Sequence, residues 1–166
     1  MRVIVTGGAG FIGSNFIRYL LEAHPDYLVT NLDNLTYAGN LENLADCRGL
    51  ENYRLVRGDI CDRMLVGSLL KQADAVVHFA AESHVDRSIA DTSPVFETNI
   101  RGTYTLLECA RSVRLQRVVH VSTDEVYGSI ADGHATEQSA LAPSSPYSAA
   151  KAASDMLVLA DRKSVV

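Results

Sequence analysis

The chain has 166 residues, which is the usual size of a single domain with its own hydrophobic core. Hydrophobic residues make up 47% of the chain and charged residues 21%, a balance that excludes a largely disordered protein. The formal net charge of -5 argues against a nucleic-acid partner, because phosphate binding needs clustered basic residues.

The sequence carries no pattern for membrane insertion or export. No apolar run approaches the roughly 20 residues that a transmembrane helix needs, so no membrane association is expected. The glycines within residues 7–10 interrupt the amino terminus before it reaches the length of a signal-peptide core. Cys47, Cys61 and Cys109 lack metal-ligand or disulfide-framework spacing. We therefore expect a cytoplasmic location and no metal site.

Strand and helix patterns alternate along the chain. A β-branched strand at residues 2–6 is followed by glycines and by a helix with apolar residues in helical spacing. Further strands are expected at 28–32, 53–57, 75–80 and 117–122, and helices at 11–24, 62–72, 94–114 and 149–160, with a helix start at 144–146. This alternation predicts an α/β domain built on a doubly wound parallel sheet. Ligands of such sheets bind at the carboxyl ends of the strands.

The glycine cluster TGGAGFIG lies directly between the first strand and the first helix. Gly7 is expected to allow a tight turn, Gly10 the close approach of a pyrophosphate, and Gly13 the packing of helix on strand. The first helical residues, Phe11 and Ile12, begin a helix terminus whose N–H groups and dipole attract an anion. The alternative is an ordinary turn, but the strand before and the helix after favour a dinucleotide site.

An acid follows the second predicted strand, 20 residues beyond Gly13. Asp33 is placed to accept hydrogen bonds from an adenosine ribose, and its charge disfavours a 2′-phosphate. The neighbouring cofactor-site residues Asn34, Leu35 and Thr36 offer no basic group to neutralise such a phosphate. The pattern therefore favours NAD over NADP, the alternative for Asp33 being a cap of the following loop.

Asp59 and Ile60 follow the third predicted strand. Two roles are open from the sequence: the pair flanks the adenine of the cofactor, or Asp59 caps the helix that follows.

A tyrosine and a lysine stand four residues apart in YSAAK, on one face of the last predicted helix. The ammonium of Lys151 would lower the pKa of the Tyr147 phenol and let it accept a proton from a substrate hydroxyl. Ser122 and Thr123, after the fifth strand, can hydrogen-bond the same hydroxyl. The alternative is a pair of surface neighbours without chemistry.

These motifs resemble the extended short-chain dehydrogenase/reductase superfamily. The run STDEVYG at 122–128 resembles the active-site signature of the dTDP-glucose 4,6-dehydratases, as do residues 33–39, 78–87 and 97–103. The resemblance extends to about Leu159. It implies that residues 1–166 form a Rossmann-type NAD-binding domain, with a carboxyl-terminal substrate domain missing from this chain. It also implies a homodimer formed through the helices predicted around 94–114 and 149–159.

The resemblance further implies a lyase that acts on a nucleotide sugar, dTDP-glucose being preferred, in deoxysugar biosynthesis. Tyr147 would take the C4 hydroxyl proton, Glu125 the C5 proton, and Asp124 would protonate the C6 hydroxyl as water leaves. Thr123 belongs to the same catalytic and substrate-binding set. For the acid pair, the alternative is a solvated turn. The resemblance also places other residues at the site: Ala80, Ala81, Glu82, Ser83 and Thr98 along the cofactor, and His84 near the sugar phosphate.

Two other functions remain open from the sequence. A nucleotide-sugar 4-epimerase shares the glycine turn and the Tyr147–Lys151 pair but has no use for an acid pair that expels water. A catalytically silent NAD-binding module would keep only the cofactor residues. Since contacts to the nucleotide would come from the missing domain, we expect at most weak NAD affinity and little turnover from these residues alone.

Overall fold

The computed structural model describes residues 1–164. They divide into two compact units. Unit 1 comprises Met1–Ala80 and Thr105–Val121, and unit 2 comprises Ala81–Tyr104 and the residues from Ser122 onward. No helix within 1–164 is long and apolar enough to cross a membrane. That residues 1–166 work as one NAD-binding domain stays a prediction.

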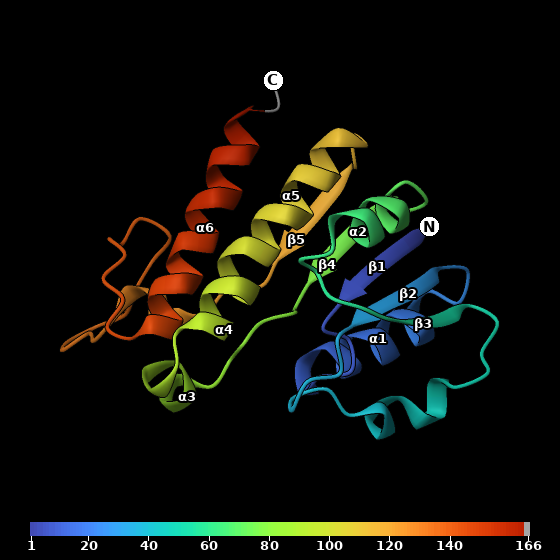
Figure 1. Cartoon of the computed structure of the whole chain (residues 1–166), viewed down its shortest axis with the longest axis horizontal. Coiled ribbons are helices and arrows are strands. Elements are labelled where there is room, and N and C mark those ends of the chain that lie inside the picture. The colour runs from blue at the N-terminus through green and yellow to red at the C-terminus, as the bar shows by residue number, and fades with distance from the viewer. Residues whose placement is uncertain (165–166) are drawn as a thin grey trace. The chain divides into compact units, whose positions relative to one another are not determined.

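Unit 1 contains a five-stranded parallel sheet (Figure 1). Its strands are β1 (Arg2–Thr6), β2 (Leu28–Asp33), β3 (Tyr53–Arg57), β4 (Ala75–His78) and β5 (Arg117–His120). Their order in the sheet is β3-β2-β1-β4-β5, so the winding direction reverses between β1 and β4. The predicted doubly wound topology is therefore confirmed, and β4 and β5 each end two residues earlier than the sequence pattern suggested.

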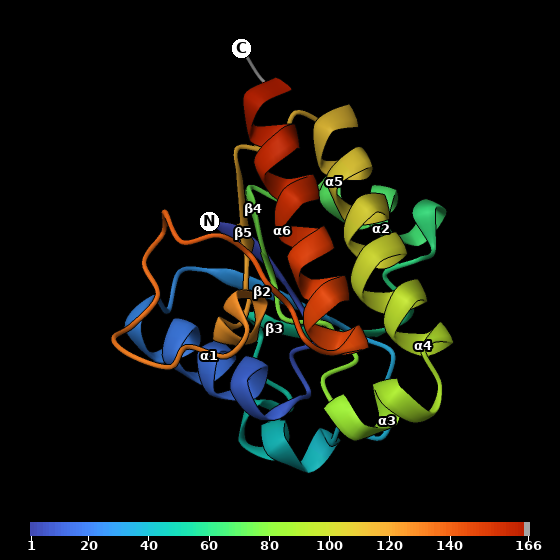
Figure 2. The same cartoon turned by 90° about the vertical axis from the view of Figure 1, so that its left-hand side faces the viewer.

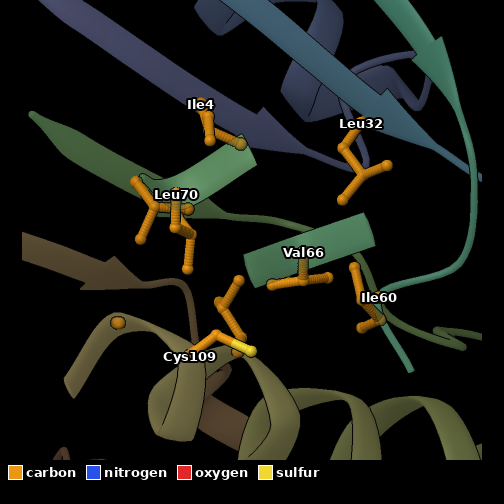
Figure 3. Close-up of a cluster of buried hydrophobic side chains, with 9 residues drawn as sticks. Ile4, Leu32, Ile60, Val66, Leu70 and Cys109 are labelled. Carbon is orange, nitrogen blue, oxygen red and sulfur yellow. The ribbon is translucent and has the colours of Figure 1, made fainter. Parts of the chain in front are cut away.

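Helices cover both faces of this sheet. On one face, Val66 and Leu70 of the short helix α2 and Cys109 of α5 join Ile4 and Leu32 in a buried cluster (Figure 3). The other face packs against α1 and against η1, a 3-10 helix between β2 and β3 where the sequence analysis predicted no helix. The bounds are Phe11–Ala23 for α1, Leu41–Cys47 for η1, Arg63–Leu70 for α2 and Thr103–Ser112 for α5. Burying one such aliphatic side chain stabilises the fold by about 1.5–3 kcal/mol.

Unit 2 is built around its longest helix, α6. This helix packs against η3 and against three short segments that follow one another in the chain. Figure 2 shows α3 and α4 beside the amino-terminal end of α6. The bounds are Val85–Ala90 for α3, Ser93–Val95 for α4, Phe96–Gly102 for η2, Asp124–Tyr127 for η3 and Pro146–Ser164 for α6. The start of α6 at a proline agrees with the sequence pattern.

The helix expected over 94–114 is confirmed as a helical stretch over residues 93–112, but it is not α-helical throughout. That stretch consists of α4, the π-helix η2 and α5. The carbonyl of Asn99, inside η2, accepts hydrogen bonds from the hydroxyls of Thr103 at 2.7 Å and Ser154 at 2.5 Å. These two donors occupy a carbonyl that a regular α-helix would use for its own ladder.

Candidate functional site

The glycine turn of unit 1 has the geometry that only glycine allows at its first position. Gly7 adopts φ +70°, and a Cβ there would lie 2.6 Å from the backbone nitrogen of Ala80. Its N–H donates to the carbonyl of Leu32 at 2.9 Å. A Cβ at Gly13 would collide with the carbonyl oxygen of Gly7. The turn therefore packs directly against the segment that follows β4 and against the first turn of α1.

The first turn of α1 carries no acidic side chain. Gly10 is the N-cap of this helix and makes no side-chain cap. Phe11 and Ile12 are exposed, at 82% and 62%. The first-turn N–H groups of a helix point outward and carry a partial positive charge. The residues present therefore fit a bound pyrophosphate.

Asp33, at the end of β2, is buried and held by two backbone donors. One carboxylate oxygen accepts the N–H of Ala9 and the other the N–H of Leu35, each at 2.8 Å. Each oxygen keeps a second lone pair for a ribose hydroxyl. Asp33 thus also caps the following loop, the role weighed as its alternative. Asn34 and Thr36 are exposed beside it.

Asn31, in β2, holds the glycine turn in place although the sequence analysis did not single it out. Its buried side chain accepts the N–H of Gly8 at 3.0 Å and donates to the hydroxyl of Tyr53 at 3.1 Å. Burial raises the pKa of the Tyr53 phenol, which keeps it protonated as the acceptor of this bond. The available signal was a polar residue at the centre of a buried strand.

The cap of α2 is Asp62, because its carboxylate accepts the N–H groups of the first helical turn. The helix-cap role considered for Asp59 is therefore wrong. Asp59 accepts the N–H of Cys61 at 2.7 Å and the amide of Asn34 at 3.3 Å. The side chain of Ile60 is buried in the core (Figure 3), so any cofactor contact of Ile60 falls to its backbone.

At the end of β4, a buried hydrogen-bond chain leads to Ala80, the first residue of the segment predicted to line the cofactor. Thr6 Oγ1 lies 2.6 Å from His78 Nδ1 and accepts the N–H of Ala80 at 3.3 Å. His78 is 2% exposed, as expected for a packed core histidine. The chain fixes the backbone against which Gly7 packs.

In unit 2, the acid pair begins the 3-10 helix η3. The hydroxyl of Thr123 accepts the N–H of Glu125 and donates to a carboxylate oxygen of Asp124, both at 3.3 Å. Val126 is buried and anchors the turn, whereas both carboxylates are exposed. Gly128 ends the turn at φ +72°, where a Cβ would meet the carbonyl of Ala142. Hydrogen bonds with the Thr123 hydroxyl, rather than burial of the carboxylates, position Asp124 and the backbone of Glu125.

The amino terminus of α6 is stabilised by two serines. Ser145 Oγ accepts the N–H of Ser148 at 3.0 Å, and Ser148 Oγ accepts the N–H of Ser145 at 2.9 Å, which is a reciprocal cap. The backbone N–H of Tyr147 donates to Ser88 Oγ at 3.2 Å. These bonds fix the rotation of the helix at the residue that carries the phenol.

Tyr147 and Lys151 lie on one buried face of α6, at 9% and 4% exposure. The alternative of a surface neighbour pair is therefore wrong. Burial lowers the pKa of the Lys151 ammonium, and the attraction of Asp155 partly opposes this change. The hydroxyl of Ser122 donates a hydrogen bond to the carboxylate of Asp155 at 2.6 Å. The hydroxyls of Ser122 and Thr123 were both expected to reach a substrate. The hydroxyl of Ser122 is bonded to α6, whereas that of Thr123 bonds to Asp124 and Glu125.

The segment after β4 is held by Asn99, which the sequence analysis missed. Asn99 Oδ1 accepts the N–H of Glu82 at 2.8 Å, and its Nδ2 donates to the carbonyl of Glu82 at 2.9 Å. Asn99 is buried, and no local sequence signal marks this partner 17 residues away. The other predicted site residues here differ in exposure: Ala81 and Thr98 are half-buried, and Ser83 and His84 are exposed.

Comparison with known proteins identifies the family. The model of the family described as GDP-mannose 4,6 dehydratase matches residues 4–165. A dTDP-glucose 4,6-dehydratase of Streptomyces niveus is 56% identical over 96% of this chain and 49% of its own length. One from Mycobacterium tuberculosis is 54% identical, over 96% and 48%. The chain thus spans about half the length of these curated relatives.

Solved structures agree with this result. The dTDP-glucose 4,6-dehydratase DesIV of Streptomyces venezuelae, crystallised with NAD and TYD bound, has a TM-score of 0.95 and 57% identity over 98% of this chain and 52% of its own. A UDP-glucose 4-epimerase of Thermus thermophilus in complex with NAD has a TM-score of 0.88 and 35% identity, over 99% and 51%. The expected resemblance to dTDP-glucose 4,6-dehydratases is confirmed, and the chain belongs to the GDP-mannose 4,6 dehydratase family.

Proposed function

We propose that this chain carries the cofactor-binding and acid-base residues of a nucleotide-sugar 4,6-dehydratase that converts dTDP-glucose to dTDP-4-keto-6-deoxyglucose. One observation carries this proposal: η3, which presents Asp124 and Glu125, packs against α6, which holds Tyr147 and Lys151 on a buried face. Dehydration needs one group to protonate the leaving hydroxyl and another to remove a carbon-bound proton. Two carboxyls beside a Tyr/Lys pair supply both.

NAD is the proposed cofactor. The N–H groups at the start of α1 would bind its pyrophosphate and Asp33 its ribose, and the close relative DesIV was crystallised with NAD. Glu82, held by Asn99, belongs to the segment proposed to line it. A bound nicotinamide supplies the hydride chemistry, removal from C4 of the sugar and return to C6.

The acid-base steps are assigned to unit 2. The ammonium of Lys151 stabilises Tyr147 as a phenolate, which accepts the proton of the C4 hydroxyl and becomes a neutral phenol. The ketone formed at C4 acidifies C5, from which Glu125 removes the proton. Asp124 donates a proton to the C6 hydroxyl, which leaves as water. Return of hydride to C6 would be accompanied by transfer of a proton from Glu125 to C5, after exchange of that proton with solvent. The hydroxyl of Thr123, already bonded to Asp124, orients the sugar beside the acid pair.

A 4-epimerase is the second candidate, because solved epimerases share the fold at 28% to 35% identity. Epimerisation inverts C4 and removes no water, so it does not need the carboxyl groups of Asp124 and Glu125 for expulsion of a hydroxyl. The higher identity to dehydratases, 57% for DesIV, also favours dehydration.

A chimera tests the proposal, since the relatives are about twice as long. Residues 1–164 would replace the matching part of DesIV, and the purified protein would be incubated with dTDP-glucose and NAD in deuterated water. We expect a sugar that has lost water and carries deuterium at C5, detected by mass spectrometry and NMR. Glu125→Gln should lower kcat by roughly 100-fold or more, whereas Glu137→Gln, a change in the loop before α6, should not.

A product of unchanged mass with inverted C4 would establish epimerase chemistry instead. A folded chimera that binds NAD and leaves dTDP-glucose intact would show that these residues form a silent cofactor-binding module.

We further propose a cytoplasmic homodimer. No disulfide joins Cys47, Cys61 and Cys109, which suits a reducing compartment. Phe96, Met156 and Leu159 of unit 2 are 58%, 49% and 44% exposed, apolar surface that a second copy would cover. Sedimentation of the chimera with these three residues changed to serine should give a monomer.

A further inference from the structure

Asp155 lies one helical turn beyond Lys151 and two turns beyond Tyr147. Residues spaced by four along an α-helix share a face, so the three side chains form one row on α6. The carboxylate of Asp155 also accepts the hydroxyl proton of Ser122 at 2.6 Å. Asp155 thus joins α6 to the residue that directly precedes Thr123 and the acid pair.

The ammonium of Lys151 needs such a partner. It is 4% exposed, and an isolated buried charge is strongly unfavourable. Burial lowers the pKa of Lys151, while the negative charge of Asp155 raises it. Other charged groups stand on the elements packed against α6: Asp86 and Arg87 on α3, Glu97 and Arg101 on η2, and Asp124 and Glu125 on η3. Glu97 and Arg101 form an ion pair with each other.

We propose that Asp155 is a positioning residue of the acid-base site. Its carboxylate accepts the Ser122 hydroxyl and attracts the Lys151 ammonium, and so holds the segment carrying Thr123 and the face carrying Tyr147 in one arrangement. The part concerning catalysis rests on the proposed function of Lys151, whereas the electrostatic and hydrogen-bonding parts can be measured on the 166-residue chain itself.

Lysine NMR measures the electrostatic part directly. The chain contains three lysines, Lys71, Lys151 and Lys163, so carbon-13 labelling at Cε gives three signals, and Lys151→Arg identifies one of them. Asp155→Asn removes the charge yet retains an oxygen that accepts the Ser122 hydroxyl. We expect this variant to shift the titration of Lys151 to lower pH, because burial then acts without the opposing attraction.

Matched variants separate charge from other effects. Asp155→Glu restores a carboxylate and should return the titration towards that of the unchanged chain. Asp161→Asn removes a different carboxylate from the same helix and should leave Lys151 unaffected. Asp155→Ser is a second charge-removing variant, and it should give the same direction as Asp155→Asn. An identical Lys151 titration in the Asp155 and Asp161 variants would overturn the proposal.

Ser122→Ala tests the hydrogen-bonding part. It removes the link to α6 and keeps the carboxylate, so Lys151 should not titrate at lower pH. The N–H of Glu125, bonded to Thr123, should exchange with deuterated solvent at least about tenfold faster once the segment is released. Unchanged exchange would contradict the positioning role. None of these measurements involves turnover, so failure of the proposed function would leave their outcome unaffected.

Discussion

At the scale of single residues, Gly7 combines two constraints that no other residue type satisfies. Its φ of +70° is costly for a residue with a Cβ, and that Cβ would lie 2.6 Å from the backbone of β4's following segment. We predict that Gly7→Ala lowers the free energy of unfolding by about 3 kcal/mol or more, the sum of left-handed strain and overpacking. Urea unfolding of the chain measures this change.

Gly49 provides the matched control within the same unit. It has φ +83° and nothing within 4 Å of an added Cβ. Gly49→Ala should therefore cost only the left-handed strain, about 1–2 kcal/mol. Equal losses in the two variants would mean that the turn relaxes away from Ala80, and the close approach would then have no energetic importance.

The buried ammonium of Lys151 lowers the free energy of unfolding of the chain. Burial holds the pKa of Lys151 in the folded chain below the ordinary value of 10.5, which applies to the unfolded chain. At pH values between the folded-state and the unfolded-state pKa, the unfolded chain therefore binds more protons than the folded chain. Stability therefore rises as the pH increases through this window. We predict that Lys151→Met is more stable than the unchanged chain at pH 7 and that the difference shrinks as the pH approaches 10.5. Urea unfolding at several pH values tests both parts, and a lysine chain that is the more stable at pH 7 would refute the sign.

At the scale of elements, the π-helix η2 places Asn99 where its side chain pairs with both backbone groups of Glu82. We predict that Asn99→Ala destabilises the chain by about 1–3 kcal/mol, because the buried amide no longer satisfies those groups. The N–H of Glu82 should lose its protection from hydrogen exchange. Asn15→Ala, on the exposed surface of α1, serves as the control and should change neither quantity. Retained protection at Glu82 would show that another group replaces Asn99.

The same elements show how far the sequence could predict the fold. The existence of the strands and the doubly wound parallel class follow from short β-branched runs alternating with helical spacing, since both patterns are local, whereas the strand order comes from the structure. The π-helix contains Asn99, whose carbonyl accepts the hydroxyl of Ser154 from 55 residues away. No local pattern contains that contact. α3 and η1 were missed because they are only six and seven residues long, too short for a helical period of apolar residues to be recognised.

The candidate site divides in the same way. The glycine turn, Asp33 and the Tyr147–Lys151 pair were found because their spacing expresses a backbone geometry directly. Asn31, Asn99 and Asp155 were missed because each acts through a partner distant in sequence. For Asp59 and Asp62 the sequence offered two acids near one helix start, and only the observed donors distinguish the cap.

At the scale of the whole molecule, cofactor binding should stabilise the chain by mass action. At a concentration 100 times the Kd, a ligand that binds only the folded state adds about 2.7 kcal/mol, which for a chain of this size raises Tm by roughly 5–11 °C. We predict such a shift with NAD at high concentration and a smaller one with NADP, because the anchored carboxylate of Asp33 repels a 2′-phosphate. Thermal unfolding with each dinucleotide measures the difference, and Asp33→Asn should reduce it. Equal shifts of Tm with NAD and NADP would show that Asp33 does not select between the two dinucleotides. The absence of a shift with either would show that the glycine turn of this chain does not bind the cofactor.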